Sequence, residues 1–160
     1  MSLPEEASMA GRRLAGKRVL ITQADVFMGP VLCEVFAGHG ATVIASTGSL
    51  VSAGAPPAIV AEAGHVDILI ANLAIPAPST AATEASEDEW NDIFAALVLP
   101  LGRLFRAVLP AMIERRSGKI LVMGSASALR GMKRASTYSA ARGAQLAYVQ
   151  AVGVEVAPHN

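Results

Sequence analysis

Short apolar runs alternate with longer segments of helical periodicity along most of the chain, and this alternation is the strongest constraint on its fold. The apolar runs, which we predict to be buried strands, are Lys17–Thr22, Ala41–Ala45, Val66–Ala71 and Lys119–Gly124. The segments between and after them, which we predict to be helices, are Met28–Gly38, Pro57–Ala63, Ser86–Arg116 and Thr137–Ala157. Strands that alternate with helices form a parallel sheet with helices on both faces. The sequence therefore predicts an α/β fold with a doubly wound parallel sheet.

The two longest predicted helices are apolar on more than one side. Ser86–Arg116 opens with an acidic turn, as suits a helix N-terminus, and contains Pro110, which we expect to kink or divide it. In Thr137–Ala157 the apolar residues also cover more than the one face that a sheet can bury. We therefore expect the remaining face of each helix to contact another subunit, in a homo-oligomer that is a dimer or a tetramer.

The composition limits the environment and the class of ligand. A length of 160 residues suits one domain over residues 1–160, with a disordered leader expected over residues 1–15. A single cysteine, Cys33, excludes an internal disulfide and favours a cytoplasmic location. The net formal charge of zero does not point to nucleic acid, and no uninterrupted apolar run approaches the ~18 residues of a membrane span. The scattered histidines show no metal-ligand spacing, so we expect no metal.

The turn after the first predicted strand lacks the features of a dinucleotide site. Such a site needs glycines that let the backbone approach a pyrophosphate, and an acid about 20 residues further on that binds a ribose. Residues 22–29 contain only one glycine, Gly29, and Phe27 would fill the space of a pyrophosphate. No Asp or Glu lies between Glu34 and Glu62, and no Lys or Arg lies between Arg18 and Arg103. We therefore expect no NAD or NADP cofactor, although a nonstandard turn that binds one through backbone groups stays open.

Three polar residues form the candidate catalytic set. Tyr138 and Arg142 are four residues apart at the start of the last predicted helix, so they share a face. A guanidinium beside a phenol favours the phenolate, which can act as a general base. Ser125 follows the fourth predicted strand, at the sheet edge where the sites of α/β proteins form, and its hydroxyl can donate a hydrogen bond to a substrate oxygen. Asn72 follows the third strand, and we expect it to brace the backbone at this edge.

From about Leu14 onwards the chain resembles a short-chain dehydrogenase/reductase, a family with a Rossmann-like fold. Ser125 lies thirteen residues before Tyr138, which matches the spacing of the family's serine and tyrosine. The other shared landmarks are Gly16-Lys17, Gly40–Val43, Asp67–Asn72, Trp90 and Gly118–Ile120. The family's lysine is Arg142 here, and its asparagine in the long helix, seven residues after the tryptophan, is Leu97.

With these departures, the chain resembles one branch of the family, the halohydrin dehalogenases. That branch shares the Ser…Tyr-x-x-x-Arg set, here Ser125, Tyr138 and Arg142, and an aromatic residue in the first turn, here Phe27. The short stretch 46–65, which leaves no room for the usual third strand, is also similar to some of its members. Proteins of this branch continue past the catalytic helix through further strands and a loop that builds the halide pocket. The resemblance therefore implies a C-terminally truncated member of the branch.

The resemblance implies a reaction that needs no cofactor. Tyr138 would remove the hydroxyl proton of a vicinal haloalcohol, Ser125 would hold that oxygen, and Arg142 would favour the phenolate. The alkoxide would displace the neighbouring halide to give an epoxide, and an anion could open the epoxide in the reverse direction. Phe27 would belong to the substrate or halide pocket. Two alternatives stay open: an NAD(P)-dependent oxidoreductase with a degenerate cofactor motif, and a non-catalytic module of the same fold.

Overall fold

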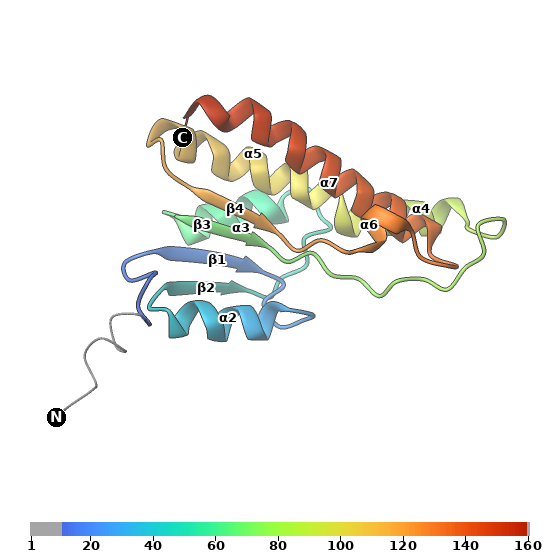
Figure 1. The fold of residues 1–160 in the computed structure, drawn as a ribbon, viewed down its shortest axis with the longest axis horizontal. Coiled ribbons are helices and arrows are strands. Elements are labelled where there is room, and N and C mark those ends of the chain that lie inside the picture. The colour runs from blue at the N-terminus through green and yellow to red at the C-terminus, as the bar shows by residue number, and fades with distance from the viewer. Residues whose placement is uncertain (1–10, 160) are drawn as a thin grey trace.

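The computed structural model describes residues 11–159 and contains the parallel sheet that the sequence predicts (Figure 1). Its strands are β1 (Arg18–Thr22), β2 (Thr42–Ser46), β3 (Ile68–Ala71) and β4 (Lys119–Val122), in the spatial order β2-β1-β3-β4. All three pairings are parallel, and Leu20 of β1 is in register with Ile44 on one side and Leu69 on the other. Because β1 and β3 occupy the middle of the sheet, their apolar residues are almost fully buried.

The helices are α2 (Gly29–Gly38), α3 (Ala55–Ala63), α4 (Glu87–Leu97), α5 (Leu99–Glu114), α6 (Ser127–Arg130) and α7 (Ser136–Val156), followed by a 3₁₀ turn at Ala157–His159. They cover both faces of the sheet, as expected from the alternation of strands and helices (Figure 1). Val19 and Ile21 of β1 face α2 and pack against its apolar side. Leu20 points the other way, into the larger core that α3, α4, α5 and α7 form. Successive side chains of a strand point to opposite faces of the sheet, so one strand contributes residues to both cores.

The long predicted helix 86–116 is divided, but not where the sequence analysis placed the division. Pro110 lies inside α5, so the expectation that it divides the helix is wrong. The break lies at Val98, between α4 and α5, and Pro100 follows it at the start of α5. A proline has no N–H and clashes with the carbonyl four residues earlier, so it is accommodated in a first helical turn. Pro100 is buried in that turn, whereas Pro110 is exposed.

The N-terminal segment is more ordered than predicted where the structure describes it. Residues 1–10 of the expected disordered leader lie outside the described residues. Residues 11–15 form a turn in which the Leu14 N–H donates to the His39 carbonyl at 2.9 Å. Leu14 also packs against the α2 side of the sheet, so this part of the leader belongs to the domain.

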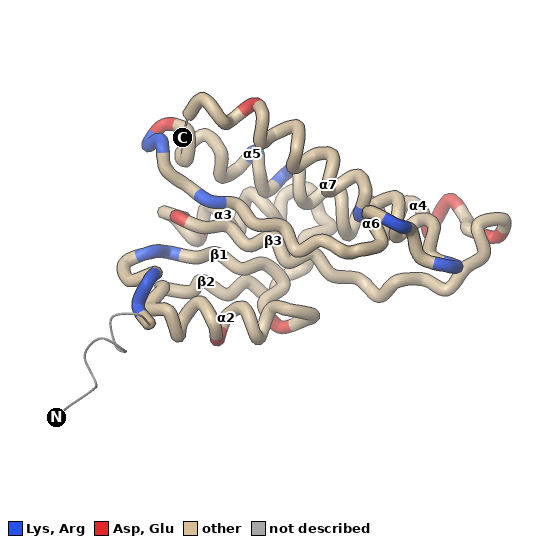
Figure 2. The backbone as a smooth tube through the Cα atoms, in the orientation of Figure 1, with Lys and Arg blue, Asp and Glu red and all other residues tan. Residues whose placement is uncertain are grey.

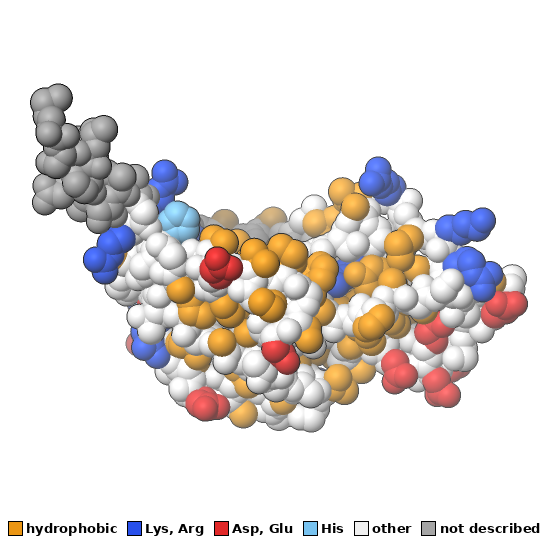
Figure 3. All heavy atoms as spheres, turned by 90° about the horizontal axis from the view of Figure 1, so that it is seen from below, with side chains coloured by type: hydrophobic (Ala, Val, Ile, Leu, Met, Phe, Trp, Pro, Cys, Tyr) orange, Lys and Arg blue, Asp and Glu red, His pale blue; other side chains and the backbone are white. Residues whose placement is uncertain are grey.

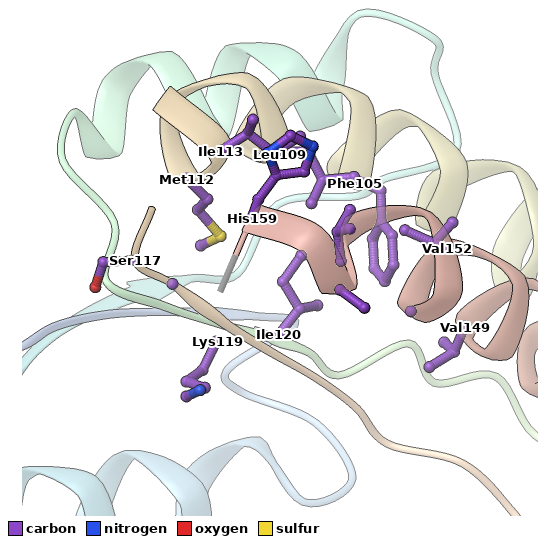
Figure 4. Close-up of a pocket in the computed structure, with 14 residues that line it drawn as sticks. Phe105, Leu109, Met112, Ile113, Ser117, Lys119, Ile120, Val149, Val152 and His159 are labelled. Atoms are coloured by element: carbon purple, nitrogen blue, oxygen red, sulfur yellow. The ribbon is translucent and has the colours of Figure 1, made fainter. Parts of the chain in front are cut away.

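Apolar surface lies outside the two cores. Hydrophobic side chains spread over the face that α2 forms (Figure 3), and Phe27, Val31 and Val35 are more than two-fifths exposed. A second apolar region is an open cavity of about 360 Å³ between α5, α7 and β4 (Figure 4). Together α4 and α5 are long and apolar enough to cross a membrane. Several of their apolar residues, such as Leu97, Leu101 and Leu104, are buried in the core, whereas Leu99 is exposed.

Candidate active site

The carboxyl edge of the sheet gathers the residues that the sequence singled out. Ser125 follows β4, Phe27 lies in the turn after β1, and Tyr138 and Arg142 lie in the first turns of α7. Charged residues gather at the amino ends of β1, β3 and β4 and also around α6 and the start of α4 (Figure 2). The candidate residues themselves include one cation, Arg142, whose buried charge has a strong effect on its neighbours.

A short turn holds the side chain of Ser125 and leaves the Ser125 O–H free to donate a hydrogen bond. Its Oγ accepts a hydrogen bond from the Ser127 N–H at 3.2 Å and one from the Ser127 hydroxyl at 2.9 Å. Ser127 is buried and begins α6, so it fixes the position of the Ser125 oxygen. Because both of these bonds use Ser125 as the acceptor, the Ser125 O–H can donate to an oxygen of a bound molecule.

Arg142 is almost completely buried, with 2% of its surface exposed, and it joins the ends of two strands. One terminal nitrogen donates to the Met123 carbonyl after β4 at 2.8 Å, and the other donates to the Leu73 carbonyl after β3 at 3.0 Å. A third hydrogen bond, of 3.0 Å, runs to the side-chain oxygen of Gln145. The planar fork of a guanidinium suits this arrangement, because its donors point in several fixed directions.

Tyr138 lies against this buried cation. The guanidinium carbon of Arg142 is 5.0 Å from the centre of the Tyr138 ring, which is within the range of a cation–π contact. The shared helix face that the sequence predicts is therefore present. The contact is made with the ring, while the donors of Arg142 point to the carbonyls and to Gln145.

The start of α7 is fixed by a carboxylate from another helix. Thr137 is fully buried, and its hydroxyl donates to the Glu89 carboxylate of α4 at 2.7 Å. Hydrogen bonds from Thr80 and from Thr137 lower the pKa of Glu89 below its ordinary value. Glu89 therefore stays ionised, and it anchors the residue that directly precedes Tyr138.

Gln145 is a residue of this region that the sequence analysis did not single out. It is buried, and it links Arg142 to the carbonyl of Leu97 at the end of α4. A signal was present in the sequence. Gln145 is a polar residue within the apolar surface of a helix, three positions after Arg142, where the side chains of a helix meet.

The turn after β1 is closed upon itself. Asn72 donates from its side-chain nitrogen to the carbonyls of Gln23 and Val26, at 2.9 and 3.0 Å, which confirms the bracing role expected from the sequence. Gln23 and Phe27 both adopt positive φ angles, 44° and 53°, a conformation that is uncommon for residues other than glycine. Phe27 is 60% exposed, and its backbone shape is therefore imposed by the turn and not by burial of its ring.

This closed turn also engages a backbone donor at the N-terminus of α2. In a dinucleotide fold, free backbone N–H groups at this position bind the pyrophosphate. Here the Gly29 N–H donates to the Val26 carbonyl, and Pro30 has no N–H. Positions 29 and 30 therefore offer no free N–H to a nicotinamide dinucleotide, the cofactor that the resemblance to dehydrogenases implies.

A cavity of about 200 Å³ adjoins the catalytic candidates. Ser125, Arg142 and Gln145 line it together with apolar residues of β4, α6 and α7. Neither Tyr138 nor Phe27 is among the residues that line it. The larger cavity of Figure 4 is apolar and contains none of the candidate residues, so we place the site at the smaller one.

The chain is similar in sequence and in structure to known enzymes. The sequence profile of the family described as short chain dehydrogenase matches residues 51–160. The chain is similar to the 3-oxoacyl-(acyl-carrier-protein) reductase of Vibrio harveyi, with 28% identity over 90% of this chain and 69% of that protein. The corresponding reductase of Vibrio cholerae is 30% identical, again over 90% and 69%. A solved structure of a dehalogenation enzyme superposes with a TM-score of 0.83 and 28% identity, over 91% of this chain and 68% of that chain.

Proposed function

Because the chain belongs to the short chain dehydrogenase family, we propose that it uses the site of that family for a reaction without a nicotinamide cofactor: the conversion of a vicinal haloalcohol to an epoxide with release of halide. Ser125, Tyr138 and Arg142 are the residues that we assign to the reaction. The reverse reaction opens an epoxide with an anion. The small molecules that this proposal requires are a haloalcohol or epoxide and a halide.

One observation carries the proposal. The turn at residues 23–29 bonds to itself and to Asn72, and its closure occupies the Gly29 N–H that a pyrophosphate would use. A solved dehalogenation enzyme of similar fold, at 28% identity, supports the assignment of a dehalogenation.

The proposed step conserves atoms and charge within one substrate and one enzyme. Tyr138, as the phenolate, accepts the proton of the substrate hydroxyl, and Ser125 donates a hydrogen bond to the same oxygen. The alkoxide attacks the adjacent carbon, where a carbon–oxygen bond forms as the carbon–halogen bond breaks. The halide leaves with the bonding electron pair. Because nucleophile and leaving group belong to the same molecule, the reaction gains from proximity.

In this proposal Arg142 supplies a fixed positive charge. It is buried among neutral acceptors and stacked on the Tyr138 ring, so its charge acts through surroundings of low polarity. A nearby cation stabilises a phenolate relative to a phenol. Arg142 thus places its charge beside the ring of the residue to which we assign the proton transfer.

A second candidate function is that of a reductase. Two sequence relatives of the chain, from Vibrio harveyi and Vibrio cholerae, are 3-oxoacyl-(acyl-carrier-protein) reductases, which favours it. That function would need the nicotinamide nucleotide to bind a turn in which the Gly29 N–H is already engaged. It would also need Arg142 to release its backbone acceptors in order to contact a cofactor, since its terminal nitrogens are committed to Met123, Leu73 and Gln145.

The test is halide release from a small vicinal haloalcohol such as bromoethanol, without added nucleotide. The protein should release bromide, Tyr138→Phe should release none, and Ser125→Ala should be slowed about a hundredfold, as for the loss of one donor to a reacting oxygen. Tyr148→Phe is the matched control, because Tyr148 is the only other tyrosine and lies further along the same helix. If the wild-type protein releases no halide but reduces a ketone with NADH or NADPH, the reductase is the correct function.

A separate experiment tests the role of Arg142. Arg142→Gln removes the charge at similar length, so halide release should fall at neutral pH and recover in part as the pH rises towards about 10, the ordinary range of a tyrosine. Arg142→Lys should retain more activity than Arg142→Gln, because the charge remains. If Arg142→Gln lowers the rate equally at every pH, Arg142 does not act on Tyr138.

A further inference from the structure

The break between α4 and α5 leaves backbone carbonyls without their usual helical partners. In an unbroken helix, Ala96 and Leu97 would accept from the N–H groups four residues later. Pro100 has no N–H, and the Leu101 N–H donates instead to the Val98 carbonyl, at 3.1 Å. A buried carbonyl needs another donor, because an unpaired one costs free energy.

Gln145 provides that donor for Leu97. Its side-chain nitrogen lies 2.6 Å from the Leu97 carbonyl, and Gln145 is 2% exposed. Because the amide nitrogen of Gln145 donates to the Leu97 carbonyl, the amide oxygen of Gln145 points away from that carbonyl. There it accepts from Arg142 at 3.0 Å. The helix break, Gln145 and Arg142 are thus joined in one chain of hydrogen bonds.

The groups that accept hydrogen bonds from Arg142 are neutral. They are the carbonyls of Met123 and Leu73 and the amide oxygen of Gln145. Within the described residues no carboxylate forms an ion pair with Arg142, and the Glu89 carboxylate on the adjoining helix is engaged by threonines. A carboxylate in place of the Gln145 amide would still accept the hydrogen bond, but it would cancel the charge.

We propose that Gln145 is a positioning residue of the active site, which ties Arg142 to the helix break and keeps it an uncompensated cation against the ring of Tyr138. The catalytic meaning of this role rests on the proposed function. The physical claim, that Gln145 controls the ionisation of Tyr138 through Arg142, does not depend on which substrate the site takes. An amide is suited to this role, because it can donate to Leu97 and accept from Arg142 without carrying charge.

The experiment follows the ionisation of Tyr138 and needs no substrate. The chain has two tyrosines, so in a Tyr148→Phe background the absorbance of tyrosinate reports Tyr138 alone. Gln145→Glu should move the midpoint of this titration about one unit to higher pH, because it neutralises the neighbouring cation. Gln145→Met, which removes both hydrogen bonds, should move the midpoint in the same direction. Gln150→Met, an exposed glutamine of the same helix, should leave it unchanged.

A double mutant shows whether the effect passes through Arg142. In the Arg142→Gln background, Gln145→Glu should no longer raise the midpoint by the same amount, since there is no cation left to neutralise. Circular dichroism of each variant confirms that the fold is kept, and Gln145→Glu remains the decisive variant if Gln145→Met does not fold. An unchanged midpoint in Gln145→Glu would overturn the proposal. A shifted midpoint in a protein that releases no halide would support the proposal and refute only the dehalogenation.

Discussion

Replacement of Gly29 by alanine tests whether the turn after β1 is closed as the structure shows. A Cβ at Gly29 would lie 2.5 Å from the Gln23 carbonyl oxygen and 2.6 Å from two backbone atoms of Ala24. These contacts are well inside van der Waals distance, and all three atoms belong to the backbone. No side chain can rotate away to relieve them, so the turn itself must open.

The expected cost follows from what holds the turn in place. Moving the Gln23 carbonyl strains its hydrogen bond to Asn72, a residue that is fully buried. Overpacking typically costs 1–3 kcal/mol, and a weakened hydrogen bond to a buried group adds about 1 kcal/mol. We therefore expect Gly29→Ala to lower the free energy of unfolding by about 2–4 kcal/mol, a large part of the stability of a small domain.

Urea unfolding followed by circular dichroism, with no nucleotide present, measures this difference. Gly38→Ala is the matched control, because it lies at the other end of α2 and a Cβ there would meet nothing within 4 Å. It should be neutral or slightly stabilising, since alanine favours helix more than glycine does. If Gly29→Ala is as stable as Gly38→Ala, the turn is not closed, and the argument against a nucleotide loses its main support.

Three other predictions concern separate parts of the molecule. Titration of the protein with NADH should show no binding tighter than about 100 µM, roughly 5.5 kcal/mol on the affinity scale, and a tighter complex would contradict the proposed function. Burial opposes ionisation of the Asp67 carboxyl, but hydrogen bonds from the Arg18 N–H and from His65 lower its pKa overall. Asp67→Asn should therefore lower the stability measured by urea unfolding above about pH 4, and its difference from wild type should vanish as the pH falls further; a difference that is independent of pH would refute this. Apolar residues remain exposed on the long helices, such as Leu99 and Val154, so light scattering should show a discrete dimer or tetramer, and a monomer at micromolar concentration would contradict this.

The sequence was sufficient to predict the sheet because its strands are short apolar runs, and the central strands β1 and β3 are buried on both faces. Such strands appear as continuous apolar runs, and the predicted runs contain β1, β3 and β4 in full and most of β2. The position of the helix break could not be predicted from the sequence in the same way. Pro100 and Pro110 are both prolines within one helical pattern, and only their surroundings determine which of them ends a helix. Pro100 is buried at the break, where Gln145 satisfies a freed carbonyl.

The contact between Tyr138 and Arg142 was predictable from the sequence, but the hydrogen-bond partners of Arg142 were not. The spacing of Tyr138 and Arg142 along a helix indicates a shared face, and the structure has that contact. The acceptors of Arg142 lie at the ends of β3 and β4, far away in sequence, so no local pattern could reveal them. The spacing of Gln145 three residues after Arg142 indicates that their side chains meet, but its bond to the Leu97 carbonyl, 48 residues away, has no local pattern.

The anchoring of Arg142 has a consequence for the order in which the protein folds. Its two carbonyl acceptors precede it by 69 and 19 residues, and the β1–β3 pairing joins Leu20 to Leu69. Contacts between such distant segments form slowly, because long loops must close before the contacts are made. The cation can reach its final position only after β3 and β4 have paired. Catalytic competence should therefore arise with the last folding step, and recovery of activity during refolding should lag behind recovery of helix.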